Sequence, residues 1–266
     1  MTPFFAEVLT LCSPSPVPRI VRKDGWVRSR PHHVIFDLDG TLADSSQGIL
    51  WSFRATLDRI GVEAREDQLR ELIGPPLGES FRILGVDEED IDDVVALYRK
   101  YYAERGVYEA RLYDGVASTL KELSDQGVGL AVATAKRVDF ARQMLASMGI
   151  ADFFDEIAGA SVDLCITSKF DVMAQVLNTW KIVGDRDVWM VGDRHYDMVA
   201  ALAHKISAVG ALWGFGSDLE LREAGANWLV SRPTDLLDAD GGGGSPVCLL
   251  DETCEVCGRV LDSSHD

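Results

Sequence analysis

Short apolar runs alternate with amphipathic segments along most of the chain. The runs with the length of a buried strand are "HVIFDL" from His33, "VGLAVAT" from Val128, "EIAGA" from Glu156, "DVWMV" from Asp187 and "SAVGAL" from Ser207. The segments between them repeat apolar residues at helical spacing, as "KFDVMAQVLNTW" does from Lys169. Alternating strands and helices form parallel sheets with helices on both faces. We therefore expect an α/β fold with a doubly wound parallel sheet.

The stretch after the first predicted strand has helical periodicity and no strand pattern. Ile49, Phe53 and Leu57 share one helical face, and "EEDIDDVVALYRKYYAERG" repeats the pattern further on. Between these two segments, "IGPPLGESF" at 73–81 is expected to be a loop because of its glycine and proline content. Residues 46–112 are therefore predicted to form an all-helical cap domain inserted into the sheet domain.

The sheet domain itself is predicted to comprise residues 33–45 and 113–238. Near its end, Ser217 and Glu220 have the spacing of a capping box, which predicts a helix start. The short apolar run "NWLV" that follows is a candidate edge strand.

The two ends of the chain have the composition of irregular segments. Residues 1–31 are punctuated by proline, and we expect a disordered extension there; the sequence leaves open whether it belongs to the mature protein. Residues 239–266 begin with a flexible glycine-rich linker and end in a tail that contains cysteines. This tail either binds zinc or is solvated without a metal, and its candidate ligands are Cys248, Cys254, Cys257 and His265.

Composition and charge exclude several classes of protein. The 266 residues carry a formal net charge of −17, which argues against a nucleic-acid polymer as partner because phosphate backbones require basic surfaces. No apolar run approaches the roughly 18 residues that span a bilayer. The five cysteines are an odd number and do not suggest a disulfide framework, so we expect a cytoplasmic protein that binds neither membranes nor nucleic acids.

Polar residues gather where the predicted strands end. Asp37 and Asp39 follow the first strand, Thr134 ends "LAVAT", and Asp193 and Asp197 follow "VWMVG". Ligands of open α/β sheets bind beyond the carboxyl ends of the strands, so these side chains are expected to converge. Carboxylates that converge repel one another unless a divalent cation lies between them, and oxygen ligands of this kind suit Mg²⁺.

Such an arrangement is suited to phosphoryl transfer. One carboxylate can attack phosphorus and form an aspartyl-phosphate, and a second carboxyl group two residues away can give a proton to the leaving alkoxide. The Thr134 hydroxyl, backbone N–H groups near Gly40 and Ala135, and a lysine would hold the remaining phosphoryl oxygens.

Four motifs occur in the order "DLDGTLADS", "VATAK", "SKFDVMAQVL" and "MVGDRHYD". By these motifs the chain resembles the haloacid dehalogenase-like hydrolase superfamily over about residues 33–238. The resemblance implies a Rossmann-like hydrolase core, Asp37 as nucleophile and Asp39 as acid/base, with Thr134 and Lys169 as phosphate binders. It also implies a Mg²⁺ site whose ligands are Asp37, Asp39, Asp193 and Asp197, with Asp39 offering its backbone carbonyl.

Several assignments stay open at this stage. Lys136 lies two residues after Thr134 and can reach the same phosphate as Lys169, although Lys169 is preferred because it begins a helix after a loop. Further candidates, each also explained by an ordinary surface, helix-start or packing role, are Arg54, Arg82, His195, Trp213 and Phe215.

Within the superfamily, "IGPPLGESF" and "IAGASVD" resemble phosphoglycolate phosphatase-like and 5'-nucleotidase-like members. We therefore expect a Mg²⁺-dependent phosphomonoesterase that acts on a small soluble phosphate ester. A phosphomutase, a dehalogenase and a noncatalytic phosphate-binding module are the alternatives. The sequence identifies neither the ester nor the oligomeric state.

Overall fold

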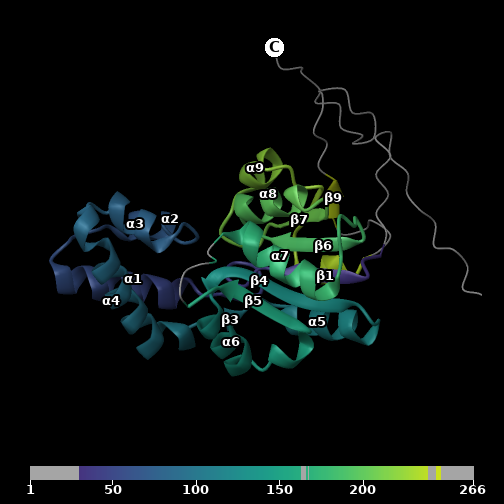
Figure 1. Ribbon diagram of the computed structural model, residues 1–266, viewed down its shortest axis with the longest axis horizontal. Helices are drawn as coiled ribbons and strands as arrows, with labels where there is room; N and C mark the ends of the chain where they lie inside the picture. Colours follow the sequence, from purple (N-terminus) through teal and green to yellow (C-terminus); the bar gives the residue numbers. More distant parts are fainter. Residues whose placement is uncertain (1–29, 163–165, 167, 239–243, 247–266) are drawn as a thin grey trace, which may run out of the picture.

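The computed structural model describes residues 30–162, 166, 168–238 and 244–246. Within these ranges the core is a seven-stranded sheet with the order β5-β4-β1-β6-β7-β8-β9 (Figure 1). All neighbouring strands pair in parallel except β9, which pairs antiparallel with β8. The strands are β1 (His33–Phe36), β4 (Gly129–Arg137), β5 (Glu156–Ala160), β6 (Val188–Gly192), β7 (Ser207–Ala211), β8 (Trp228–Val230) and β9 (Gly244–Pro246).

Helices cover both faces of this sheet, as the alternation of strands and helices predicts. Successive residues of β1 point to opposite faces, so Val34 and Phe36 belong to one buried cluster and Ile35 belongs to another. Helices α5 (Val116–Asp125) and α6 (Val138–Ser147) pack on the first face. The second face is covered by α7 (Lys169–Trp180), α8 (His195–Ala203) and α9 (Asp218–Glu223).

The insertion after β1 forms a helical cap beside the sheet, at the left of Figure 1. Its helices are α1 (Ser46–Ile60), α2 (Glu66–Glu71), α3 (Leu77–Ile83) and α4 (Ile91–Glu104), with 3₁₀ turns at Glu88–Asp90 and Gly106–Tyr108. Two further 3₁₀ turns, Ala151–Phe153 and Pro233–Leu236, lie in the sheet domain. The cap has an aromatic centre in which the Phe53 ring lies 5.3 Å from Phe81 and 4.9 Å from Tyr98, measured between centroids. Burial of each such ring contributes roughly 1.5–3 kcal/mol.

Three expectations about elements need correction. The cap is not all-helical over 46–112, because β3 (Arg111–Leu112) pairs antiparallel with β2 (Ala43–Asp44) where the chain enters and leaves the cap. The predicted loop at 73–81 ends at Pro76, and α3 begins at the next residue, Leu77, since proline is well tolerated at a helix start.

The third correction concerns the linker, because Gly244–Pro246 adds β9 to the sheet inside the segment expected to be flexible. Pairing at a sheet edge uses backbone groups and needs no apolar side chain, so composition does not reveal it. The candidate edge strand "NWLV" forms β8 and therefore lies inside the edge. Residues 1–29, 239–243 and 247–266 lie outside the described residues, as do the four candidate zinc ligands. No helix of the described part is long and apolar enough to cross a bilayer.

Candidate active site

The predicted catalytic residues meet at the carboxyl end of the sheet. Asp37 follows β1, and its backbone N–H donates to the carbonyl of Val191 in β6 at 2.9 Å, which holds Asp37 beside the end of β6. Asp193 follows β6 directly, and Thr134 lies in the neighbouring β4. β4 does not end at Thr134 as expected but continues irregularly to Arg137, with a register shift between these two residues.

Three carboxylates form a buried cluster. Oxygen atoms of Asp37, Asp193 and Asp197 all lie within 4.8 Å of one another. Burial raises the pKa of Asp193 to about 8, and the charges of Asp37 and Asp197 add to this effect. Burial also raises the pKa of Asp37 to about 6, although Lys169 opposes the shift. The cluster is therefore short of positive charge, as predicted for a metal site.

Lys169 supplies the direct cationic contact to this cluster. Its Nζ lies 2.7 Å from Asp37 Oδ1 and 2.8 Å from Asp197 Oδ1, and it donates to the carbonyl of Ala133 at 3.1 Å. Burial alone would lower the pKa of Lys169, but the two carboxylates raise it above its usual value. The ammonium group thus stays charged beside Asp37, which agrees with the preference for Lys169 over Lys136.

Asp39 lies outside the acidic cluster. Its Oδ1 accepts a hydrogen bond from Ser45, and its Oδ2 lies 3.1 Å from Lys136 Nζ. The same ammonium donates to the Tyr102 hydroxyl of the cap at 2.8 Å. The Asp39 side chain therefore does not point to a metal bound by the other three carboxylates. If Asp39 is a metal ligand, its backbone carbonyl is the atom that remains to bind the ion. Lys136 therefore pairs with Asp39, whereas Lys169 pairs with Asp37.

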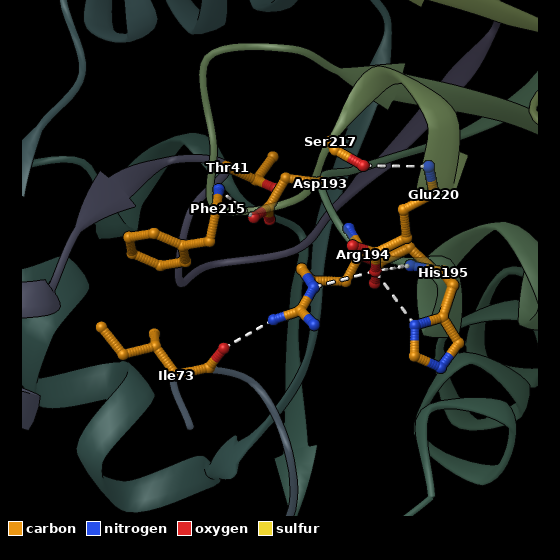
Figure 2. Close-up of polar contacts among 9 residues, drawn as sticks. Thr41, Ile73, Asp193, Arg194, His195, Phe215, Ser217 and Glu220 are labelled. Carbon is orange, nitrogen blue, oxygen red and sulfur yellow. Dashed lines mark hydrogen bonds and ion pairs between the residues drawn. The ribbon is translucent and has the colours of Figure 1, made fainter. Parts of the chain in front are cut away.

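Asp193 is held by hydrogen bonds to both of its oxygens. Thr41 Oγ1 donates to Oδ1 at 2.8 Å, and the backbone N–H of Phe215 donates to Oδ2 at 2.8 Å; both groups are directed at the carboxylate in Figure 2. The backbone must also come close, because a Cβ atom at Gly40 would lie 2.2 Å from Asp193 Oδ2. Gly40 thus makes room for the carboxylate. Its own N–H donates to the carbonyl of Ala43 and is not free to bind phosphate, so phosphate binding by other backbone N–H groups near Gly40 stays a prediction.

Arg194 joins the sheet domain to the cap. Its Nε donates to Glu220 Oε1 at 2.9 Å, and Nη1 donates to the carbonyl of Ile73 at 2.5 Å (Figure 2). Glu220 also accepts from the His195 backbone at 3.0 Å. Burial by itself would raise the pKa of Glu220, but these hydrogen bonds lower it to about 2. The Arg194 backbone N–H donates to Asp197 Oδ2 at 3.1 Å, so one residue contacts both the acidic cluster and the cap.

A cavity of about 600 Å³ lies between the sheet domain and the cap. Its lining from the sheet domain includes the predicted residues Asp37, Asp39, Thr134, Ala135 and Lys169. The cap contributes mainly apolar and aromatic groups, among them Ile49, Phe53, Val95, Tyr98, Tyr102 and the turn 73–77. The cavity therefore has a polar, acidic side on the sheet domain and a mainly apolar side on the cap.

The remaining sequence candidates have structural roles. Arg54 and Arg82 pair with Glu66 and Glu88 at the surface. His195 begins α8 and contacts Glu220, and the Trp213 indole donates to the carbonyl of Thr41 at 2.9 Å. Phe215 lines the cavity and is the candidate that also supports Asp193.

Sequence reasoning missed four contributors to the site. Thr41 and Ser45 lie within the motif "DLDGTLADSS", where a hydroxyl close to clustered carboxylates is a usable signal. Arg194 and Glu220 are far apart along the chain, so no local spacing reveals their pairing.

The donor set fits a hard divalent cation. Buried carboxylate oxygens are the atoms that Mg²⁺ prefers. Burial, and to a smaller extent the charges of the neighbouring carboxylates, raises the pKa values of Asp37 and Asp193, and a cation among them would offset both effects. Asp37 and Asp193 are the residues best placed to hold it. Both oxygens of Asp197 are already engaged, by Lys169 and by the Arg194 amide, which suits a supporting position.

Known proteins are similar to this chain in sequence and in fold. The chain is 44% identical over 187 residues to the tyrosine-protein kinase PtkA of Mycobacterium tuberculosis, covering 70% of this chain and 64% of that protein. It is 34% identical to a 5'-nucleotidase of Pseudomonas aeruginosa, covering 71% of this chain and 86% of the relative. A crystal structure from Clostridium acetobutylicum, described as a predicted phosphatase, has 38% identity and a TM-score of 0.74, with coverages of 78% and 97%.

Residues 34–211 match the family model of the haloacid dehalogenase-like hydrolases, a span that includes every residue of the acidic cluster. The doubly wound sheet and the acidic cluster at its carboxyl end are what the sequence motifs predicted. The chain belongs to the haloacid dehalogenase-like hydrolase family.

Proposed function

We propose that this protein is a Mg²⁺-dependent phosphomonoesterase that hydrolyses a small soluble phosphate ester through an aspartyl-phosphate. The carrying observation is the environment of Asp37. Lys169 and the Leu38 amide both bind Oδ1, at 2.7 Å each, and no hydrogen bond from the described residues reaches Oδ2. Asp37 also lines the cavity, so Oδ2 is the oxygen left to attack phosphorus.

The two half-reactions use the two aspartates in turn. Asp37 Oδ2 forms a bond to phosphorus while the ester P–O bond breaks, and the leaving oxygen takes a proton from Asp39. Water then attacks the phosphorus of the aspartyl-phosphate, gives a proton to Asp39, and releases phosphate and the Asp37 carboxylate. When bound, Mg²⁺ would offset the negative charge shared by Asp37, Asp193 and the phosphoryl oxygens. Thr134 and Lys169 hold the phosphoryl group during both steps.

The cap is where this proposal places the choice of substrate. Its aromatic and apolar residues form the cavity wall that faces the catalytic aspartates. Cap helices packed over the site would also keep bulk water out during the first step. One relative is named a 5'-nucleotidase, and this name fits an ester whose leaving group is a nucleoside. The proposal also allows a phosphoglycolate phosphatase-like substrate in place of a nucleotide.

Two alternatives on this fold are less well supported. A dehalogenase has no leaving alkoxide to protonate, so Asp39, the carboxyl group two residues after Asp37, would have no proton to deliver. A noncatalytic binding module would not need an acid/base residue at all.

A phosphotransferase is the second candidate function, because the mycobacterial relative is named a tyrosine-protein kinase. An aspartyl-phosphate can pass its phosphoryl group to a tyrosine hydroxyl instead of water. Incubation with ATP and a tyrosine-containing peptide tests this candidate, and phosphotyrosine formation without phosphate release would favour it.

The proposed function is tested by phosphate release from a panel of metabolite esters, with and without Mg²⁺. We expect Asp37→Asn to reduce release by at least about 1,000-fold, because the isosteric amide is a poor nucleophile. Asp58→Asn, an exposed cap residue that loses the same charge, is the matched control and should keep full activity. Equal activity of Asp37→Asn and the parent protein would overturn the assignment.

A further inference from the structure

The cationic side chains of the cavity differ in whether they have a carboxylate partner. In the described chain, each such side chain on the sheet domain is paired with at least one acid. The pairs are Lys136 with Asp39, Arg137 with Asp139, Lys169 with Asp37 and Asp197, and Arg194 with Glu220.

Arg99 of the cap is the exception. It lies on α4, four residues after Val95 and three before Tyr102, so these three residues share one side of the helix, and all of them line the cavity. Arg99 is half-buried, yet it has no hydrogen bond or ion pair with any residue that the structure describes. Carboxylates are abundant in a chain with 43 acidic and 26 basic residues, so a lack of available acids does not explain this.

The surroundings of Arg99 favour an anion. Burial lowers the pKa of its guanidinium and the charge of Arg137 lowers it further, whereas the charges of Asp139 and Asp92 oppose this to a smaller extent. A negatively charged ligand group would relieve both effects, and charge-assisted hydrogen bonds from arginine to carboxylate or phosphate are strong and directional.

The fold separates this position from the nucleophile. Strand β4 carries Thr134 at the catalytic centre and Arg137 at its end, and a strand rises about 3.3 Å per residue, so Arg137 lies up to about 10 Å further along. Near this stretch the cavity is lined by Tyr102 and Phe140, whose ring centroids lie 5.4 Å apart, and by Lys136, whose charge is paired with Asp39. A carbon skeleton, and not a second ionic group, fits that middle section.

We propose that Arg99 binds a second anionic group carried on the leaving group of the substrate. The inference rests on the proposed phosphomonoesterase function and narrows the substrate class to phosphate esters with a carboxylate or second phosphate. In such an ester Lys169 and Thr134 hold the reacting phosphoryl group, and Arg99 of the cap holds the far end. Substrate binding would then draw on both domains.

Matched pairs of esters test this assignment. The carboxylate ester 4-carboxyphenyl phosphate and its amide 4-carbamoylphenyl phosphate have the same shape but differ in charge. We expect the parent protein to prefer the carboxylate, and Arg99→Gln to lower kcat/KM for the carboxylate about 10- to 100-fold, mainly through KM. The amide should be hydrolysed equally by both proteins, and Arg99→Lys should restore part of the preference.

Lys100→Gln is the matched control, because it removes one positive charge from the exposed neighbour on the same helix. Its preference should equal that of the parent protein. No preference in the parent protein, or an equal loss for both esters in Arg99→Gln, would overturn the inference. Titration of the corresponding phosphonates by calorimetry measures the same preference without turnover. A protein that binds the carboxylated phosphonate through Arg99 but hydrolyses no ester would refute only the proposed function.

Discussion

At the scale of single residues, the acidic cluster depends on glycines as much as on aspartates. Gly40 has a φ of +84°, which a residue with a side chain adopts only with strain, and the Asp193 carboxylate occupies the space that its Cβ would need. Gly214, in the loop after β7, also lies against Asp193, because a Cβ atom at Gly214 would lie 2.3 Å from the Cβ of Asp193. The position of Asp193 is therefore fixed by backbone that comes too close for any side chain.

We expect Gly40→Ala to displace Asp193 and to reduce Mg²⁺-dependent hydrolysis by at least about 100-fold, since misplacement by about 1 Å can cost that much. Gly61→Ala is the matched control, because Gly61 also has a positive φ of +74° but nothing lies within 4 Å of its Cβ position. It should lose only about 1 kcal/mol of stability and no activity. Equal activity losses in the two variants, measured by phosphate release beside denaturant unfolding, would show that backbone strain alone is responsible.

The residue scale also shows how far sequence could specify the site. Order and spacing of motifs were enough to predict that Asp37 and Asp193 converge, because the carboxyl ends of β1 and β6 are neighbours in the sheet. They also favoured Lys169 over Lys136 as the phosphate-binding lysine, but they gave Lys136 no partner of its own. That depends on side-chain direction, which places Lys136 on Asp39 and leaves Lys169 to Asp37.

At the scale of elements, prediction succeeded where side chains decide the structure. Strands and helices of the core follow from apolar periodicity, and their order along the chain gives the parallel sheet. The elements that were missed, β3 and β9, are two and three residues long and pair through backbone hydrogen bonds, which apolar periodicity does not reveal. β2 and β3 pair because the chain leaves the sheet domain and returns to it at neighbouring places. The residues of either strand alone do not predict this pairing.

The contact between Arg194 and the turn before α3 is also an element-scale feature. Its hydrogen bond to the Ile73 carbonyl holds a cap segment that lines the cavity, and a Cβ at Gly74 would lie 2.3 Å from Nη1. We expect Arg194→Met to speed amide hydrogen exchange in residues 73–77 about 10-fold or more and to raise KM, because the turn loses its contact with the sheet domain.

Arg54→Met provides the control for that variant, since it removes an arginine of the cap that pairs with Glu66 at the surface. Exchange in residues 73–77 should then remain as in the parent protein. Unchanged exchange in Arg194→Met would mean that the turn is held by its own packing, and the hydrogen bond to Ile73 would have no organising role.

At the scale of the whole molecule, the acidic cluster links stability to pH. Burial raises the pKa of Asp193 to about 8 from an ordinary value of 3.8, and that of Asp37 to about 6. Without metal, the folded protein therefore keeps protons between about pH 4 and 8 that the unfolded chain has released. The stability from these protons is complete below about pH 4 and is lost as the pH rises through about 8.

Mg²⁺ should reverse that loss, because it binds the ionised carboxylates and must displace the protons. We expect millimolar Mg²⁺ to raise the midpoint of thermal unfolding by several degrees at pH 8.5 and by less than about 1 °C at pH 5.5. Asp193→Asn, which removes the carboxylate with the most strongly raised pKa, should lose most of the Mg²⁺ effect, whereas the exposed Asp58→Asn should retain it. A Mg²⁺ shift of equal size at both pH values, or one that persists in Asp193→Asn, would place the metal away from this cluster.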